Sequence, residues 1–180
     1  YGGGNTGILE IRNGGVVYAN TTYVGRIASS TGAIYLYDGT LNQNTSTGNA
    51  QFGYGVNSTG TFVQSGGTSN FGNNVNVGSG TGSVGQFTVS GGTVNIGKQF
   101  YIGDADSIGR MDVIGSGATI NMNGTMSSTN RFFMYANQST LGFTIQDATG
   151  VSCINAYYTN LSGGTIDMTL SGYTPTDGAT

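Results

Sequence analysis

Residues 85–109 contain three short segments in which apolar residues occupy every second position. The segments are Phe87–Val89, Val94–Ile96 and Phe100–Ile102, and glycine or small polar residues follow each of them. Apolar residues two positions apart lie on one face of a β-strand, and the residue between them faces the other way. The stretch therefore predicts three short strands separated by turns, which together make one rung of a coil.

The rest of the chain repeats this rung. First strands begin at glycines spaced 24 to 33 residues apart, namely Gly7, Gly32, Gly60, Gly85, Gly109 and Gly142. A repeat of this length indicates a solenoid, in which each rung buries its apolar face by stacking on the next. We therefore predict an all-β protein built as a parallel β-helix, right-handed like other parallel crossovers. It has about six rungs of three short strands, stacked in three sheets. A β-propeller is the weaker alternative, because a blade uses four strands over about 40 residues or more.

The repeat predicts a single domain over residues 1–180. Residues 1–6 lead in and residues 7–141 form five regular rungs. Residues 142–180 form an irregular terminal rung, which we expect to be cut short or continued in a longer protein. Within the coil Gln64 takes an inward position among apolar residues, so it needs a hydrogen-bond partner there.

The composition favours a folded, turn-rich protein over a disordered one. Only 7% of the residues are charged and 34 are glycine, but the chain also has 11 Tyr and 8 Phe, residues that disordered chains lack. With a net charge of −3 and five Lys and Arg residues, we expect no basic patch and no nucleic-acid partner. No apolar run approaches the roughly 20 residues of a membrane-spanning helix, so we expect no membrane span.

Two rungs carry related motifs. They are Gly-Thr-Phe-Val-Gln-Ser-Gly-Gly-Thr at residues 60–68 and Gly-Gln-Phe-Thr-Val-Ser-Gly-Gly-Thr-Val-Asn-Ile-Gly at residues 85–97. These motifs resemble the repeats of large secreted bacterial β-helix proteins, as in autotransporter passenger domains and PEP-CTERM-type surface proteins. Residues 170–180 are also similar to the segment that closes such arrays in the PEP-CTERM type. The resemblance implies an extracellular or cell-surface location and a structural or adhesive role.

The second strands share a Thr-x-Asn pattern whose threonines and asparagines face outward. Its members are Thr40, Asn42, Thr68, Asn70, Thr93, Asn95, Thr119 and Asn121, with Thr165 and Asp167 as a terminal copy. Stacked asparagines can hydrogen-bond to one another along the stack, which would make a structural ladder. The alternative is a flat lattice of hydroxyl and amide groups that binds a polysaccharide or ice. Ice-binding solenoids use Thr-x-Thr for this purpose, so the asparagine column departs from their pattern.

Alternation also places three tyrosines, Tyr35, Tyr37 and Tyr101, on outer faces as exposed aromatic residues. Exposed tyrosines stack on sugars and on other proteins. They also pack across neighbouring strands, and Arg12 is placed to lie over the ring of Tyr37. Both interpretations stay open from the sequence.

Some β-helix proteins are pectin or alginate lyases, whose chemistry needs clustered carboxylates and a basic residue on one outer face. On the outer face of the first strands, the charges of Glu10 and Arg12 are separated from Asp112 by three uncharged rungs. The loop residues Asp104 and Asp106 are a weak calcium candidate, and a solvated turn is the favoured interpretation because their spacing matches neither an EF-hand loop nor a Gly-rich calcium repeat. We therefore expect no enzymatic activity and no cofactor, with a polysaccharide lyase as the minor alternative.

Asn-x-Ser/Thr sequons, the acceptors of N-linked glycan, fall at predicted corners of the rungs. They are Asn20, Asn44, Asn57, Asn123, Asn137 and Asn160. Asparagine is also favoured in tight turns, so turn geometry explains the same placement.

Together these features predict an extracellular structural or adhesive protein, as a subunit or segment of a surface layer, matrix or self-assembling fibre. Weakly capped ends favour self-association end to end or side by side. The alternative is a module that binds glycan or ice through the Thr-x-Asn face.

Overall fold

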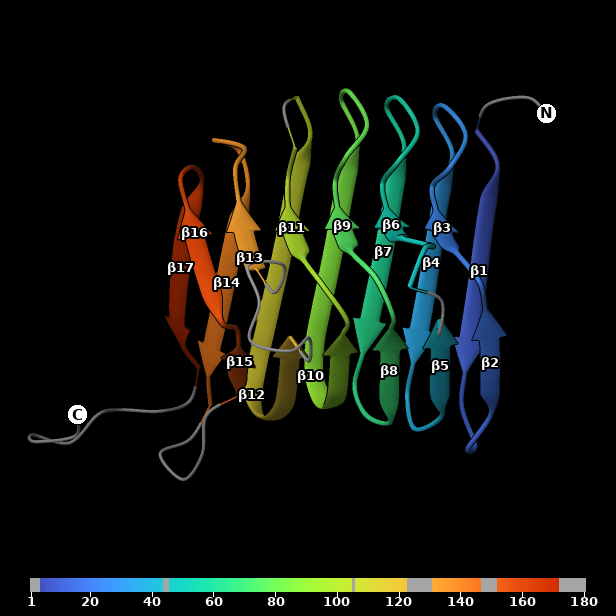
Figure 1. Ribbon diagram of the computed structural model, residues 1–180, viewed down its shortest axis with the longest axis vertical. Coiled ribbons are helices and arrows are strands. Elements are labelled where there is room, and N and C mark those ends of the chain that lie inside the picture. Colours follow the sequence, from blue (N-terminus) through green and yellow to red (C-terminus); the bar gives the residue numbers. More distant parts are fainter. Residues whose placement is uncertain (1–3, 44–45, 105, 123–130, 147–151, 172–180) are drawn as a thin grey trace, which may run out of the picture.

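A computed structural model shows an all-β chain coiled as a parallel β-solenoid. It describes residues 4–43, 46–104, 106–122, 131–146 and 152–171. The coil makes six turns, one for each strand of a six-stranded sheet, and the first and last turns lie at opposite ends (Figure 1). Within the described residues no helix has the length and apolar character that crossing a membrane requires. The predicted parallel β-helix is therefore confirmed.

Each turn contributes strands to three stacks. First strands are β1 (Thr6–Ile11), β4 (Thr31–Leu36), β7 (Thr59–Gln64), β10 (Val84–Ile96), β12 (Ile108–Met122), β14 (Thr140–Ile145) and β17 (Thr165–Leu170). Second strands are β2 (Val16–Ala19), β5 (Thr40–Gln43), β8 (Thr68–Phe71), the later parts of β10 and β12, and β15 (Cys153–Asn155). Third strands are β3 (Thr22–Val24), β6 (Ala50–Phe52), β9 (Val75–Val77), β11 (Phe100–Ile102), β13 (Arg131–Met134) and β16 (Tyr158–Leu161).

These stacks form two sheets rather than the three that we predicted. The first and second stacks merge into one 11-stranded sheet, because β10 and β12 each run without a break around the corner between them. The third strands form the six-stranded sheet.

A column of phenylalanine rings fills the interior. Six of them, Phe52, Phe62, Phe71, Phe87, Phe100 and Phe132, are almost completely buried. The rings of Phe62 and Phe87 stack with their centroids 4.6 Å apart. Alternation predicts inward side chains at nine apolar positions of the first strands, and all are buried except Leu9 in the first turn, which is 37% exposed. The nine are Leu9, Ile11, Ile34, Leu36, Phe62, Phe87, Val89, Met111 and Val113. One buried column therefore runs along the axis and opens at the first turn.

Gln64 lies in this interior with no exposed surface. Its Nε2 donates to the carbonyl oxygens of Gly67 at 3.3 Å and Thr93 at 3.1 Å. Its Oε1 accepts a hydrogen bond from the Ser69 hydroxyl at 2.8 Å. The expected partner therefore exists, and the amide joins the first and second strands of one turn to the next turn.

A buried serine that alternation does not mark stands at the corner after most third strands. The members of this column are Ser30, Ser58, Ser83, Ser107 and Ser139. The hydroxyl of Ser58 donates to the carbonyl oxygen of Gly25 at 2.7 Å, and that of Ser83 donates to Gly53 at 2.8 Å. Each of these bonds joins a corner to the turn before it. For Ser30, Ser58, Ser83 and Ser107 the signal in the sequence is a serine four or five residues after the glycine that follows a third strand, whereas Ser139 follows Ala136.

Residues 165–170 lie in a different stack from the one that we predicted. Their strand β17 pairs with β14, so Thr165 sits beside Thr140 in the first stack and Asp167 sits beside Gly142. The prediction that Thr165 and Asp167 continue the Thr-x-Asn pattern is therefore wrong. The second stack continues instead through β15, in which Asn155 pairs with Asn121.

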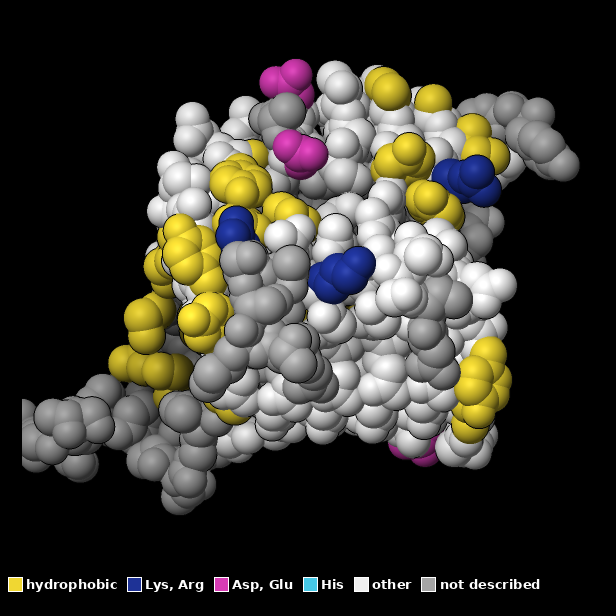
Figure 2. Space-filling view, in the orientation of Figure 1, with side chains coloured by type: hydrophobic (Ala, Val, Ile, Leu, Met, Phe, Trp, Pro, Cys, Tyr) yellow, Lys and Arg dark blue, Asp and Glu magenta, His cyan; other side chains and the backbone are white. Residues whose placement is uncertain are grey.

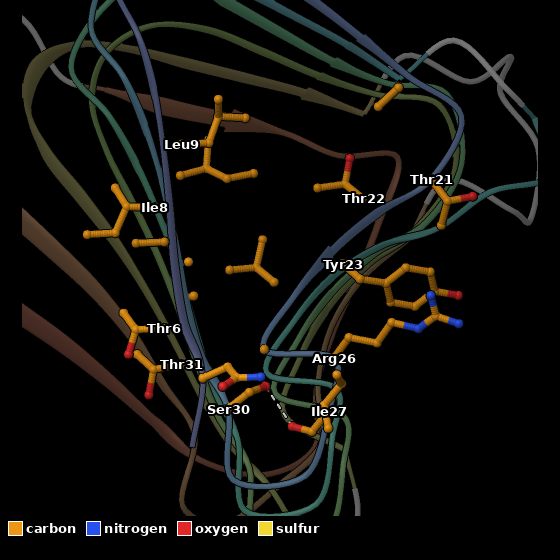
Figure 3. A pocket seen from close by; sticks show the side chains of 18 of the residues that line it. Thr6, Ile8, Leu9, Thr21, Thr22, Tyr23, Arg26, Ile27, Ser30 and Thr31 are labelled. Atoms are coloured by element: carbon orange, nitrogen blue, oxygen red, sulfur yellow. Dashed lines mark hydrogen bonds between the residues drawn. The ribbon is translucent and has the colours of Figure 1, made fainter. Parts of the chain in front are cut away.

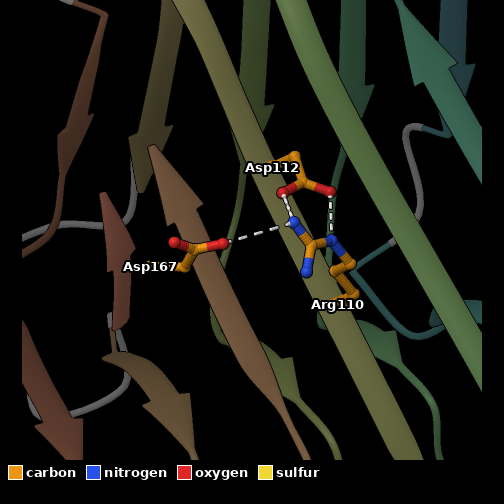
Figure 4. Close-up of polar contacts among 3 residues, drawn as sticks. All are labelled: Arg110, Asp112 and Asp167. Carbon is orange, nitrogen blue, oxygen red and sulfur yellow. Dashed lines mark hydrogen bonds and ion pairs between the residues drawn. The ribbon is translucent and has the colours of Figure 1, made fainter. Parts of the chain in front are cut away.

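The charges on the outer face of the first strands form two groups at opposite ends of the stack. Glu10 and Arg12 form an ion pair in β1. At the other end Arg110 binds both carboxylate oxygens of Asp112, at 2.6 and 2.7 Å, and reaches Asp167 at 3.9 Å (Figure 4). Gly142 lies between the two aspartates, and a Cβ there would stand 2.3 Å from Asp112 Oδ1. Because Gly142 has no side chain, the Arg110 guanidinium can reach Asp167 across β14.

Candidate functional site

The asparagines of the second stack form a continuous hydrogen-bonded ladder over five turns. In each step the side-chain amide of one asparagine donates to the side-chain oxygen of the asparagine in the preceding turn. The donor–acceptor distances are 2.7 Å for Asn70 to Asn42, 2.8 Å for Asn95 to Asn70, 3.2 Å for Asn121 to Asn95, and 2.9 Å for Asn155 to Asn121. Asn42, Asn70, Asn95 and Asn121 are half-buried. The structural interpretation of the Thr-x-Asn pattern accounts for these bonds, since the side-chain oxygen of each inner asparagine is already occupied.

The threonines of the pattern form a parallel column two residues earlier in each strand. Thr40, Thr68, Thr93 and Thr119 are in register and half-buried, and Cys153 takes the next place. The column is regular but shares its face with amides that bond along the stack. This face therefore presents a repeated column of threonine hydroxyl groups. Its asparagine amides are bonded along the stack, so the face is not a lattice of free hydroxyl and amide groups.

We expect Asn95→Ala to lower the free energy of unfolding by about 1–2 kcal/mol, because it leaves Asn70 Oδ1 and the Asn121 amide without their partners. Asn155→Ala is the matched control. It removes a single ladder bond at the exposed end of the column, so we expect a loss of about 0.5 kcal/mol. Urea-induced unfolding of both variants measures the difference. Equal losses would show that the ladder contributes no more in the middle than at its end.

The two tyrosines of β4 and its following turn pack on each other and on an arginine. Tyr35 and Tyr37 stack with their centroids 6.5 Å apart, and the guanidinium of Arg12 lies 4.9 Å from the Tyr37 ring centre. The predicted contact of Arg12 with Tyr37 is confirmed. Tyr35 points outward as predicted but is half-buried, whereas Tyr37 is 42% exposed. The prediction of an exposed Tyr35 is therefore wrong, because Tyr37 covers part of the ring.

Tyr101 belongs to an aromatic cluster on the outer face of the third strands. Its ring stacks on Phe133 at 5.1 Å, and Phe133 stacks on Tyr135 at 5.0 Å. Arg131 lies between Phe133 and Tyr158, with its guanidinium 5.9 and 5.5 Å from the two ring centres. Tyr101 is half-buried by these neighbours, which corrects the prediction that it is exposed. Burial, and then the nearby Tyr135, raise the pKa of Tyr101.

Beside this cluster the third-strand face is hollowed. The hollow, here called the third-strand groove, has a volume of about 300 Å³. Its lining residues are Asn74, Asn76, Gly78, Ser79, Tyr101, Asp104 and Tyr135. On the face shown in Figure 2, hydrophobic side chains gather toward the two ends of the coil, with mostly uncharged polar surface between them. The groove therefore combines aromatic rings at one side with small polar groups on its floor.

Several polar groups of the groove have no hydrogen-bond partner among the described residues. The Ser79 hydroxyl is buried without one. The Asn76 amide and the Asp104 carboxylate also make no hydrogen bond or ion pair within the part of the chain that the structure describes. Tyr101 donates its hydroxyl proton to Gln99. Of these groups, the Asn76 amide and the Asp104 carboxylate belong to residues with exposed surface in the groove, and they could bind a polar ligand.

Asp104 and Asp106 flank one corner, and both are exposed. The corner is closed by Ser107, whose backbone NH donates to the Asp104 carbonyl oxygen at 2.8 Å and whose hydroxyl accepts from the Asp104 backbone NH at 2.8 Å. In residues 4–43, 46–104, 106–122, 131–146 and 152–171, no three His, Cys, Asp or Glu side chains are grouped as a metal site. The geometry supports a turn, and the described residues give the calcium interpretation no third carboxylate.

The sequons differ in their placement. Asn20, Asn57 and Asn137 are exposed at corners as predicted, and the φ angle of 54° at Asn57 is the left-handed conformation that asparagine tolerates in turns. Asn160 instead lies within β16, beside Phe133, so its predicted corner position is wrong. Asn44 and Asn123 lie outside the described residues.

Three groove residues, Asn76, Ser79 and Tyr135, were not among the residues that the sequence pattern marked. Alternation in β9 and β11 does place Asn76 and Tyr101 side by side on the outer face. Ser79 and Tyr135 follow the ends of their strands, where alternation carries no information.

A comparison of the chain with protein-family models, with curated proteins and with solved structures finds no match.

Proposed function

We propose that the protein is a structural segment of an extracellular layer, matrix or fibre, and that it lengthens by stacking a further parallel rung of a second copy on each end of the coil. The observation that carries this proposal is that the first and last rungs are uncovered on their outer sides in the described chain. Both expose apolar interior residues and strands that pair on one side only among the described residues. Unpaired strand edges are templates for pairing with another chain.

A hollow of about 560 Å³ lies at the first rung, at the N-terminal end of the coil (Figure 3). Apolar residues from two turns line it, among them Leu9, Val17, Val24, Ile34 and Leu41. The strands β1, β2 and β3 at this end pair with β4, β5 and β6 alone within the described part of the chain. This end therefore offers both an apolar surface and three rows of backbone groups.

The last rung also exposes apolar side chains, so the two ends can pack against each other. Ile166, Met168 and Leu170 of β17 are at least half exposed. Ile166 and Met168 also line a hollow of about 270 Å³ together with Phe143. The strand pairs at both ends of the described chain are parallel, so the last rung of one copy has the chain direction that the first rung of the next copy requires. Such head-to-tail contact does not close, and it produces filaments.

Electron microscopy of the purified chain tests this proposal. We expect filaments with an axial repeat of roughly 30 Å, the height of six stacked rungs. Leu9→Lys and Met168→Lys place a charge in the two contacting ends and should each abolish the filaments. Gln86→Lys is the matched control, since Gln86 is exposed on the outer face in the middle of the coil. Monomers at every protein concentration, or filaments that only Gln86→Lys disrupts, would contradict end-to-end stacking.

A further inference from the structure

We propose that the third-strand groove binds a neutral sugar ring of an oligosaccharide or polysaccharide. This inference does not depend on the proposed stacking of the ends, because the groove lies on the side of the coil between the third and fifth turns. Its residues come from β9 and Asn74 just before it, from β11, and from the segments that follow β9, β11 and β13. The rigid stack of parallel strands holds them in register.

The aromatic side of the groove supplies a surface on which a sugar can stack. Tyr101 and Tyr135 both line the groove, and their ring centres are 6.1 Å apart. The cluster holds these rings in place, since Phe133 stacks on both of them. Tyr135 keeps 42% of its surface exposed. A tyrosine ring gives apolar contact area together with a polar edge, which matches the mixed apolar and hydroxyl surfaces of a pyranose.

The floor of the groove supplies hydrogen bonds of both kinds. A sugar hydroxyl both donates and accepts, so it needs partners of each type. The Asp104 carboxylate accepts, whereas the Asn76 amide and the Ser79 hydroxyl can each do either. The Ser79 hydroxyl is buried and has no partner among the described residues. The Ser79 oxygen has almost no accessible surface, so the groups that a sugar meets directly are the Asn76 amide and the Asp104 carboxylate.

Charge and size narrow the ligand class. Among the described residues that line the groove Asp104 is the charged one, and the guanidinium of Arg131 in the adjoining aromatic cluster carries the opposite charge. The two charges offset each other, so the groove offers no net charge that would attract an anionic sugar. The volume of about 300 Å³ is at the lower end of the range for small-molecule sites, which suits one or two sugar rings. The asparagines of the second stack are poorer candidates, because they bond to one another along the ladder. A neutral sugar therefore fits the groove best.

Isothermal titration with neutral oligosaccharides of glucose, mannose, xylose and N-acetylglucosamine, and with an oligouronate, tests the proposal. We expect binding of at least one neutral probe and no binding of the oligouronate. Tyr135→Ala and Asp104→Asn should each weaken that binding by about tenfold or more, as loss of an anchoring contact does. Asp104→Asn keeps the size of the side chain, so it separates binding from folding.

Tyr37→Ala provides the matched control. Tyr37 and Tyr135 are both tyrosines on an outer face with 42% of their surface exposed, but Tyr37 lies beside the first strands. We expect Tyr37→Ala to bind the sugar as the unchanged protein does. The proposal is overturned if no neutral probe binds, if the oligouronate binds more tightly, or if Tyr37→Ala weakens binding as much as Tyr135→Ala.

Discussion

Gly85→Ala should prevent the protein from reaching its native fold, or lower its free energy of unfolding by about 3 kcal/mol or more. Gly85 is the second residue of β10, where the first strand passes close to the end of the third strands. A Cβ at this position would stand 2.1 Å from the backbone nitrogen of Gly78 and 2.5 Å from the carbonyl oxygen of Phe52. Both contacts are with backbone that is hydrogen-bonded between turns, since Gly78 N donates to Phe52 O at 2.8 Å. The added methyl group can therefore be accommodated only by breaking the stack.

Gly7→Ala is the control for this prediction. Gly7, Gly32, Gly60, Gly85 and Gly109 occupy the same place in successive rungs. A Cβ on Gly7 would meet no atom within 4 Å, because no described third strand precedes the first turn. We expect Gly7→Ala to unfold at the same urea concentration as the unchanged protein or slightly above it. A Gly85→Ala protein as stable as Gly7→Ala would show that the approach of the strands is not what requires glycine.

Phe87→Ala should lower the free energy of unfolding by about 3–5 kcal/mol. Phe87 is completely buried, and its ring lies against phenylalanines from all three stacks. Its centroid is 4.6 Å from that of Phe62, 5.1 Å from that of Phe100 and 6.3 Å from that of Phe71. Removing the ring takes contacts from every wall of the coil at once and leaves a cavity, since the backbone ladder on each side prevents collapse.

Phe87→Leu separates the loss of contacts from a general effect of substitution. Leucine fills much of the same volume, so we expect a loss of less than half that of Phe87→Ala. Urea-induced unfolding and amide hydrogen exchange of both variants measure the effect, and exchange should quicken first in β7, β10 and β12. Equal stability of Phe87→Ala and the unchanged protein would contradict a core that the phenylalanine column holds together.

The repeat in the sequence determined the architecture of this protein. Alternation marked which residues of the first strands are buried, because a strand turns successive side chains to opposite faces whatever its neighbours are. The same rule placed Gln64 inside, where it needs its partners, and Arg12 beside Tyr37. The shared Thr-x-Asn pattern of the second strands also placed Asn42, Asn70, Asn95 and Asn121 in one column. These results depend on local pattern and period alone.

Tertiary structure decided the features that depend on which rung lies next to which. The residues Thr165 to Met168 carry the Thr-x-Asp pattern of a second strand, yet they pair with β14 as a first strand. A local pattern cannot specify a stack, because both stacks alternate in the same way. Tyr101 is half-buried because Phe133, 32 residues later in the chain, lies against it. The third-strand groove arises likewise, since three turns contribute its floor and rings and only their packing leaves Ser79 without a partner in the described chain.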